Sequence, residues 1–154
     1  MASDRPAGPT QPAESIPCIR ARGVIFDGDD TLWLTEALYD EARASARAVV
    51  EHAGLNGTEW ERLQRIRDLY NVTALSHSVE RFPTSCVEAL SLVGGEHVAH
   101  AVELREQVLD AARSVFEARA PLRDGATEVL AELRQRGTRL ALLTKGARSV
   151  QQRR

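Results

Sequence analysis

An apolar segment near the start of the chain runs directly into three carboxylates and a threonine. The segment reads Val24-Ile25-Phe26-Asp27-Gly28-Asp29-Asp30-Thr31-Leu32-Trp33. Because side chains alternate between the two faces of an extended strand, Asp27 and Asp29 are expected to point the same way. Two carboxylates held close together repel each other unless a bound cation or a shared proton offsets the repulsion. The pattern therefore predicts a reaction centre at the end of a strand.

Two other interpretations of this acidic segment are weaker. Asp and Gly clusters also form ordinary turns, but a turn alone does not explain a buried strand that leads into Asp27. A calcium-binding EF-hand loop needs a glycine and a glutamate at the positions where this chain has Leu32 and Leu38. We therefore take Asp27 and Asp29 as candidate catalytic residues and Asp30 as a turn residue.

A second short apolar run, residues 140–143, leads into Thr144 and Lys145. Gly137 and Gly146 bound this run, as expected for a short buried strand. Thr144 is a candidate donor to a bound anion, and a plain strand-end threonine is the alternative. Lys145 is either a contact to the same anion or a turn residue that faces solvent.

Helical periodicity occupies most of the chain between these two runs. The capping and stop signals predict helices over residues 35–53, from Thr58 onward, from about Ser85 to Gly94, over about 96–119 and over 124–136. Thr35 and Thr58 are the expected caps of the first two helices. The residues expected to face inward include Tyr70, Val102 and Val129.

The spacing of the two strands predicts an α/β fold with an inserted helical domain. Parallel strands are joined by a crossover of a dozen or more residues, and the gap here is several times longer. We therefore expect a Pro-rich disordered leader over 1–18, a parallel core formed by 19–35 and 121–154, and a helical insert over 36–120. The helix over 124–136 is then the true crossover into the second strand.

The composition excludes several classes of partner. The chain has 154 residues, and 20 Lys and Arg against 22 Asp and Glu give a net charge of -2 at pH 7. With no basic excess, nucleic acid is not an expected partner. No apolar run approaches the roughly 20 residues of a membrane helix, and no signal peptide is recognisable. We expect a cytoplasmic protein with no membrane partner, in which Cys18 and Cys86 are free thiols; the oligomeric state stays open.

Three apolar side chains have more than one interpretation. Trp33 and Tyr39 could line a substrate pocket, or they could pack between the insert and the core. Cys86 lies on the apolar face of a predicted helix and is expected in the core.

The acidic segment resembles the first signature of the haloacid dehalogenase (HAD) superfamily, an apolar strand followed by D-x-D-x-T. The resemblance implies that Asp27 is the nucleophile, that Asp29 is the general acid–base, and that Thr31 helps to fix the loop. The run that ends at Thr144 is similar to the second signature of this family, which places Thr144 and Lys145 beside the phosphate. Residues 81–90 also resemble a bacterial subgroup of these hydrolases.

The resemblance implies an incomplete HAD-type Rossmann-like core with a helical (C1-type) cap. It also implies a Mg²⁺-dependent phosphatase that acts on a small phosphorylated metabolite through an aspartyl-phosphate. Asp27 and Asp29 would bind the metal, and Thr144, Thr31 and Lys145 would bind the substrate. Dehalogenase chemistry is disfavoured, because dehalogenases of this family lack the second aspartate. A non-catalytic remnant or interaction module is the alternative.

Two further signatures of the family, a Lys or Arg and then one or two acidic residues, lie downstream of the second one. Here Thr144 is followed by ten residues, none of them acidic. We therefore expect a truncated or frame-shifted product, a deliberately shortened chain, or a domain completed by another chain. The expected turnover of the chain as given is weak or absent.

Overall fold

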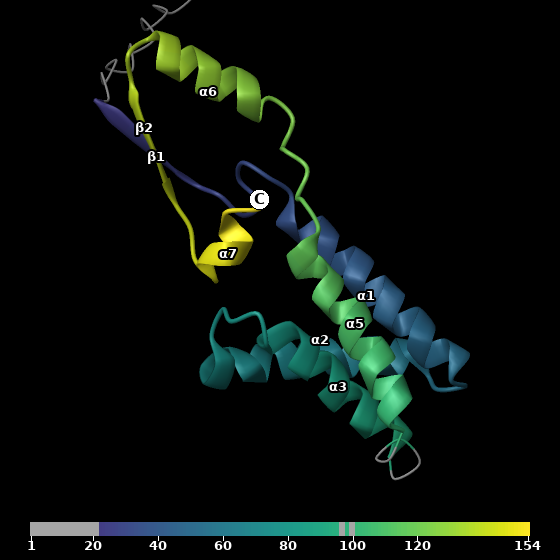
Figure 1. Cartoon of the computed structure of the whole chain (residues 1–154). Helices are drawn as coiled ribbons and strands as arrows, with labels where there is room; N and C mark the ends of the chain where they lie inside the picture. The colour runs from purple at the N-terminus through teal and green to yellow at the C-terminus, as the bar shows by residue number, and fades with distance from the viewer. Residues whose placement is uncertain (1–21, 96–97, 99–100) are drawn as a thin grey trace, which may run out of the picture.

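The computed structural model describes residues 22–95, 98 and 101–154, and shows a small sheet at one end and a cluster of helices at the other (Figure 1). The predicted leader over 1–18 lies outside the described residues. In chain order the elements are β1 (Gly23–Asp27), α1 (Thr35–His52), α2 (Gly57–Leu75), α3 (Arg81–Gly94), α5 (Val102–Glu117), α6 (Ala126–Gln135), β2 (Arg139–Leu143) and α7 (Arg148–Gln151).

Strands β1 and β2 pair in parallel, with Gly23 opposite Arg139 and Asp27 opposite Leu143. Both strands therefore end at the same edge of the sheet, and the two sequence motifs that follow them are neighbours. The predicted α/β class, with a parallel sheet and a long helical insertion, is confirmed by this topology.

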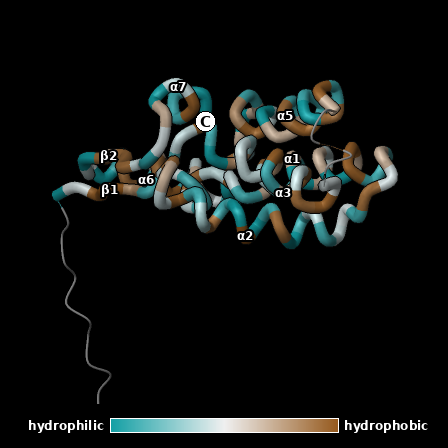
Figure 2. The backbone as a smooth tube through the Cα atoms, turned by 90° about the horizontal axis from the view of Figure 1, so that it is seen from below, coloured by the Kyte–Doolittle hydropathy of each residue, from teal (hydrophilic) through white to brown (hydrophobic). Residues whose placement is uncertain are grey.

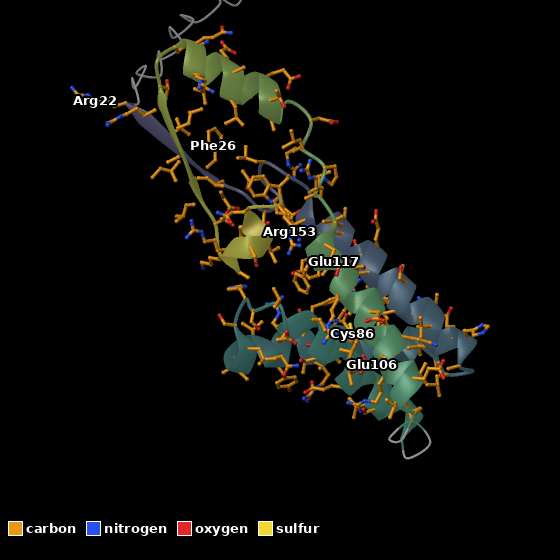
Figure 3. All side chains as sticks on the ribbon, viewed as in Figure 1. Arg22, Phe26, Cys86, Glu106, Glu117 and Arg153 are labelled. Carbon is orange, nitrogen blue, oxygen red and sulfur yellow. The ribbon has the colours of Figure 1, made fainter. Side chains whose placement is uncertain are left out.

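Helix α6 packs along one side of this narrow sheet (Figure 1). Phe26 of β1 lies between the sheet and α6, as Figure 3 shows. Other apolar side chains stay in solvent: Ile25 is 69% exposed and Leu143 is 70% exposed. The prediction that the second strand is buried is therefore wrong, because every residue of β2 is exposed in this two-stranded sheet. The prediction that Val129 is buried is wrong, because two strands are too narrow to cover this face of α6 and leave Val129 50% exposed.

Helices α1, α2, α3 and α5, which we refer to as the cap, pack together and contain the main hydrophobic core. Figure 2, coloured by hydropathy, shows brown apolar stretches that recur along the chain in these helices and in both strands. Trp60 is fully buried, and its Nε1 donates a hydrogen bond to the carbonyl oxygen of Cys86 at 3.1 Å. Cys86 is buried among the cap helices, as predicted (Figure 3). Among the described residues, no helix combines the length and apolar character needed to cross a bilayer.

The first two cap helices begin on acceptors other than the predicted ones. Asp30 Oδ1 accepts hydrogen bonds from the backbone amides of Thr35 and Glu36, at 2.9 and 3.0 Å, so Asp30 and not Thr35 serves the start of α1. Asn56 Oδ1 accepts from the backbone amide of Glu59 at 3.0 Å, so Asn56 caps α2 in place of Thr58. Both threonines lie inside the first helical turn, where a side chain no longer reaches the free amides.

The prediction that Tyr70 faces inward is wrong, because α2 buries polar side chains instead. Gln64 and Asn71 are buried, whereas Tyr70 is 69% exposed. The inward side chains are satisfied locally: Gln64 Oε1 accepts from Arg43 Nε at 3.0 Å, and Asn71 Nδ2 donates to Ser85 Oγ at 3.0 Å. A hydrophobic pattern cannot reveal a helix face that is buried through hydrogen bonds.

Two other helices start elsewhere than predicted. Helix α3 begins at Arg81, before Ser85, because Pro83 is tolerated in a first turn where its missing N–H is not needed. Helix α5 begins at Val102, which is 70% exposed in the first turn and does not face inward as predicted. The start predicted at about residue 96 lies largely outside the described residues.

The two segments that connect the sheet with the cap lie side by side. The backbone amide of Leu34 donates to the carbonyl oxygen of Pro121 at 2.8 Å, and that of Arg123 donates to Leu32 at 2.9 Å. Trp33 and Leu122 form an antiparallel bridge between them. The domain boundaries expected at residues 35/36 and 120/121 stay a prediction.

We expect Asn56→Ala to lower the free energy of unfolding by about 1 kcal/mol, because the amide of Glu59 loses its acceptor. Thr58→Ala removes only an exposed contact with Arg47 and is expected to cost less than about 0.5 kcal/mol. Urea titrations followed by circular dichroism measure both losses. A larger loss of unfolding free energy for Thr58→Ala than for Asn56→Ala would show that Thr58, and not Asn56, is the N-cap of α2.

Candidate functional site

The candidate site lies where β1 and β2 end. Asp27, the last residue of β1, has an exposed side chain, and its Oδ2 accepts a hydrogen bond from Thr31 Oγ1 at 3.1 Å. Thr31 is thus placed where it can hold the loop, the role that the resemblance implied. The other carboxylate oxygen of Asp27 accepts none of the hydrogen bonds found among the described side chains.

The loop after Asp27 folds tightly around Gly28. The carbonyl oxygen of Gly28 accepts from the backbone amides of Leu32 and Trp33, at 2.9 and 3.3 Å. A Cβ atom on residue 28 would lie 2.4 Å from Cζ2 of Trp33, so only glycine fits beneath the indole ring. Asp30 has a positive φ of 56°, a conformation that Asp tolerates better than most residues.

Asp29 accepts four hydrogen bonds, two at each carboxylate oxygen. Oδ1 accepts from Trp33 Nε1 at 2.9 Å and from Thr35 Oγ1 at 2.8 Å. Oδ2 accepts from Thr144 Oγ1 at 3.3 Å and from Gln151 Nε2 at 3.0 Å. This one carboxylate therefore joins the β1 loop, the first turn of α1, the end of β2 and helix α7.

These donors set the charge of Asp29. Burial raises the pKa of the Asp29 carboxyl, but the hydrogen bonds from its four partners lower it by more. The pKa of Asp29 therefore lies below its ordinary value, and the carboxylate is ionised at neutral pH.

Gln151 was not singled out from the sequence, although it completes this arrangement. Its Nε2 donates both to Asp29 Oδ2 and to the carbonyl oxygen of Lys145, at 3.0 and 2.8 Å. Gln151 belongs to α7, a four-residue helix directly after the β2 turn. No pattern in the sequence marks Gln151, because its contact with Asp29 exists only once α7 has folded back against the end of β2.

A cavity of about 380 Å³ opens beside Asp29, between the β2–α7 turn and the cap. Asp29, Lys145 and Gln151 line it from the core side, and Tyr39 and Arg81 line it from the cap side. Of the predicted site residues, Asp27, Thr31 and Thr144 are not part of this lining. The structure thus brings Asp29 and Lys145 to one cavity, and Asp27 is not part of its lining.

The structure separates the two roles that the sequence left open for Trp33 and Tyr39. Trp33 is only 7% exposed, and its indole N–H donates to Asp29, so its role is to pack in the interior and to hold this carboxylate in place. Tyr39 lines the cavity, and its ring packs nearly perpendicular to the rings of Phe82 and Phe116, with centroid distances of 5.1 and 6.3 Å. Burial raises the pKa of the Tyr39 phenol, which therefore stays neutral.

The loop between α2 and α3 approaches the core across this cavity. A Cβ atom on Gly146 would lie 3.9 Å from the carbonyl oxygen of His77, and both residues line the cavity. Ser76 holds a positive φ of 51°, which is an uncommon conformation for a residue other than glycine. His77 and Arg81 were not singled out as site residues, because an isolated His or Arg in a sequence carries no signal of its position.

The residues present fit a hard divalent cation only in part. Mg²⁺ prefers oxygen ligands, takes one or two carboxylates and keeps several waters. Asp27 fits, because its carboxylate is exposed and has an oxygen to offer. Asp29 fits less well, because both its oxygens already hold two donors each. Within residues 22–95, 98 and 101–154, no group of three or more His, Cys, Asp or Glu is placed to hold a metal.

Comparison with known proteins assigns this architecture to a family. The family model described as haloacid dehalogenase-like hydrolase matches residues 21–154. The chain belongs to the haloacid dehalogenase-like hydrolase family. A solved haloacid dehalogenase-like family hydrolase from Xanthomonas campestris has the same fold, with a TM-score of 0.71 at 20% identity over 86% of this chain.

The comparisons also show how much of this chain and of its relatives is covered. An uncharacterised protein of Lacticaseibacillus casei is 36% identical over 126 residues, which cover 81% of this chain. A solved dehalogenase is 20% identical over 86% of this chain, with a TM-score of 0.46. The chain spans about half the length of these relatives: 50% of the Lacticaseibacillus casei protein and 54% of the Xanthomonas campestris hydrolase.

We expect Asp29→Asn to lower the free energy of unfolding at neutral pH. The substitution replaces one acceptor oxygen by an NH₂ group, which is itself a donor and cannot accept the hydrogen bonds made there. The lowered pKa of Asp29 means that its contribution is complete above the unfolded-state pKa of about 4. The contribution is lost as the pH falls through the folded-state pKa. The difference between wild type and Asp29→Asn should therefore shrink below about pH 4.

Urea titrations at a series of pH values, without added metal, measure this difference. Glu41→Gln is the matched control, because Glu41 is an exposed carboxylate on α1 whose side chain forms none of the described hydrogen bonds. A difference for Asp29→Asn that stays constant down to about pH 2, like a simple packing defect, would contradict the assignment of the four donors to an ionised carboxylate.

Proposed function

We propose that this chain supplies the nucleophile and the acid–base group of a Mg²⁺-dependent phosphomonoesterase. The observation that carries the proposal is the hydrogen bond of 3.3 Å between Thr144 Oγ1 and Asp29 Oδ2, across 115 positions of sequence. It joins the acidic loop to the second motif at one sheet edge, next to an exposed Asp27. Ligands of open α/β sheets bind at this edge.

The proposed reaction uses Asp27 as a nucleophile. A carboxylate oxygen of Asp27 attacks phosphorus, and the bond from phosphorus to the leaving oxygen breaks, which gives an aspartyl-phosphate. The leaving oxygen takes a proton from Asp29. Water then attacks phosphorus and gives a proton to Asp29, while the bond from phosphorus to Asp27 breaks and frees the Asp27 carboxylate and inorganic phosphate. Asp29 must therefore gain a proton before the first step, whereas the second step uses the ionised form favoured by its four donors.

Thr144 and Lys145 support the same substrate from β2. The Thr144 hydroxyl can turn from Asp29 to a phosphoryl oxygen, and the Lys145 ammonium lies in the wall of the cavity. Mg²⁺ held by Asp27, and by Asp29 after its donors rearrange, would neutralise part of the phosphate charge.

The arrangement at Asp29 favours phosphate transfer over dehalogenation. A halide leaving group needs no proton, so a displacement of halide by Asp27 would not use Asp29 as an acid and would leave it only the role of base in the later hydrolysis. An alkoxide leaving group is a strong base and does need a proton, which Asp29 is placed to supply.

A second candidate is a non-catalytic module that binds a protein partner through the sheet. The observation in its favour is the exposure of apolar strand residues, with Ile25 at 69% and Leu143 at 70%. Exposed apolar patches of this kind often mark interaction surfaces.

Acetyl phosphate tests the proposal directly. With Mg²⁺, we expect wild-type chain to gain one acid-stable, base-labile phosphoryl group, seen by intact-mass spectrometry. Asp27→Asn should lower the rate at least about 10³-fold, because it removes the nucleophile. Asp124→Asn, an exposed aspartate next to α6, should react like wild type.

Labelling that is equal in Asp27→Asn and wild type would exclude Asp27 as the nucleophile. The absence of labelling, together with concentration-dependent association on size-exclusion chromatography, would favour the non-catalytic module.

A further inference from the structure

A second cavity, of about 370 Å³, lies on the cap between the first turns of α1 and α3 and the middle of α2. Three residues line both this cavity and the cavity beside Asp29, namely Glu36, Tyr39 and Arg81. The two cavities are therefore neighbours, with Tyr39 and Arg81 in the lining of both.

Three arginines line the cap cavity, and each already has a carboxylate partner. Arg43 pairs with Asp40, Arg65 Nη2 lies 3.1 Å from Glu61 Oε1, and Arg81 Nε lies 3.1 Å from Asp68 Oδ1.

The carboxylates of Glu36 and Asp68 are themselves part of the wall. The cap cavity therefore has no surplus of positive charge, and a second anionic group on a ligand would compete with carboxylates already in place.

The remaining wall groups can donate and accept hydrogen bonds without net charge. Gln64 is fully buried in this wall, its Oε1 accepts from Arg43, and its Nε2 has no hydrogen-bond partner. The bond from Arg43 fixes which end of the amide is the nitrogen, so the group left over is a donor. Tyr39 adds a neutral phenol to the lining, and Leu69 adds an apolar rim.

We infer that the cap cavity receives the neutral, hydroxyl-rich part of the substrate, so that the substrate class is a monophosphate of a sugar or polyol. This inference rests on the proposed phosphomonoesterase function for the phosphoryl end only. Hydroxyl groups both donate and accept, which matches a wall of paired arginines, carboxylates, a phenol and an amide. The C–H faces of a sugar pack against an apolar rim such as Leu69.

Leu69→Trp tests the inference without disturbing the core, because Leu69 is 74% exposed on α2. The indole should fill part of the cap cavity and leave the cavity beside Asp29 unchanged. Leu92→Trp is the matched control, because Leu92 is 57% exposed on α3 and lines neither cavity. Circular dichroism and urea unfolding confirm that both variants fold.

Isothermal titration with Mg²⁺ compares methyl phosphate, glucose 6-phosphate and glucose 1,6-bisphosphate on the whole chain. We expect glucose 6-phosphate to bind about tenfold more tightly than methyl phosphate, as one or two net hydrogen bonds provide. Leu69→Trp should reduce this gain to within about twofold, whereas Leu92→Trp should keep it. The bisphosphate should gain less than about threefold over the monophosphate at physiological salt.

Equal behaviour of Leu69→Trp and Leu92→Trp would overturn the inference, and so would a bisphosphate that binds more than about tenfold tighter than the monophosphate. Sorbitol, which carries no phosphate, tests binding in the cap cavity independently of the phosphoryl site. Saturation transfer to sorbitol that is lost only in Leu69→Trp supports the cap site even where Asp27 is not phosphorylated. No transfer to sorbitol and no gain for glucose 6-phosphate overturn it even where Asp27 is phosphorylated.

Discussion

A partly buried carboxylate with four hydrogen-bond donors holds the site together. Asp29 accepts from Trp33 and Thr35 on one oxygen and from Thr144 and Gln151 on the other. A carboxylate has about four positions for donors, so Asp29 is saturated and its rotamer is fixed. Removing any one donor leaves one acceptor position of this partly desolvated carboxylate without a partner, which is why the loop, both motifs and α7 are mutually dependent.

The cap supports this site with an interior that is apolar in one part and polar in another. Trp60 is fully buried, and large buried aromatics of this kind stabilise a fold by about 3–5 kcal/mol relative to alanine. Nearer the cavities the interior changes to hydrogen bonds, with Arg43 bonded to Gln64 and lying 5.7 Å from the centre of the Phe82 ring. In general, a site with walls fixed by such a network discriminates between ligands through hydrogen bonds. Hydrogen bonding gives a larger ratio of affinities between two competing ligands than apolar contact alone.

The sequence was sufficient for features that depend on short-range pattern and insufficient for those that depend on tertiary packing. The two strands that end at Asp27 and Leu143 followed from their apolar runs, and their parallel pairing followed from the long segment between them. The cap of α2 did not, since Asn56 and Thr58 are both acceptable capping residues and only the backbone path decides between them. Gln151 was also invisible, because its role exists only once α7 returns to the sheet edge.

The paired linkers that join the sheet and the cap have a mechanical consequence. Thr35, one of the donors to Asp29, is the first residue of α1, whereas Thr144 belongs to the sheet side. A swing of the cap about residues 33–35 would therefore stretch one set of hydrogen bonds at Asp29 while the other set stays in place. The orientation of the cap and the ionisation of Asp29 are therefore linked. A ligand that favours one orientation of the cap changes the proton affinity of Asp29, and protonation of Asp29 changes the preferred orientation by the same free energy.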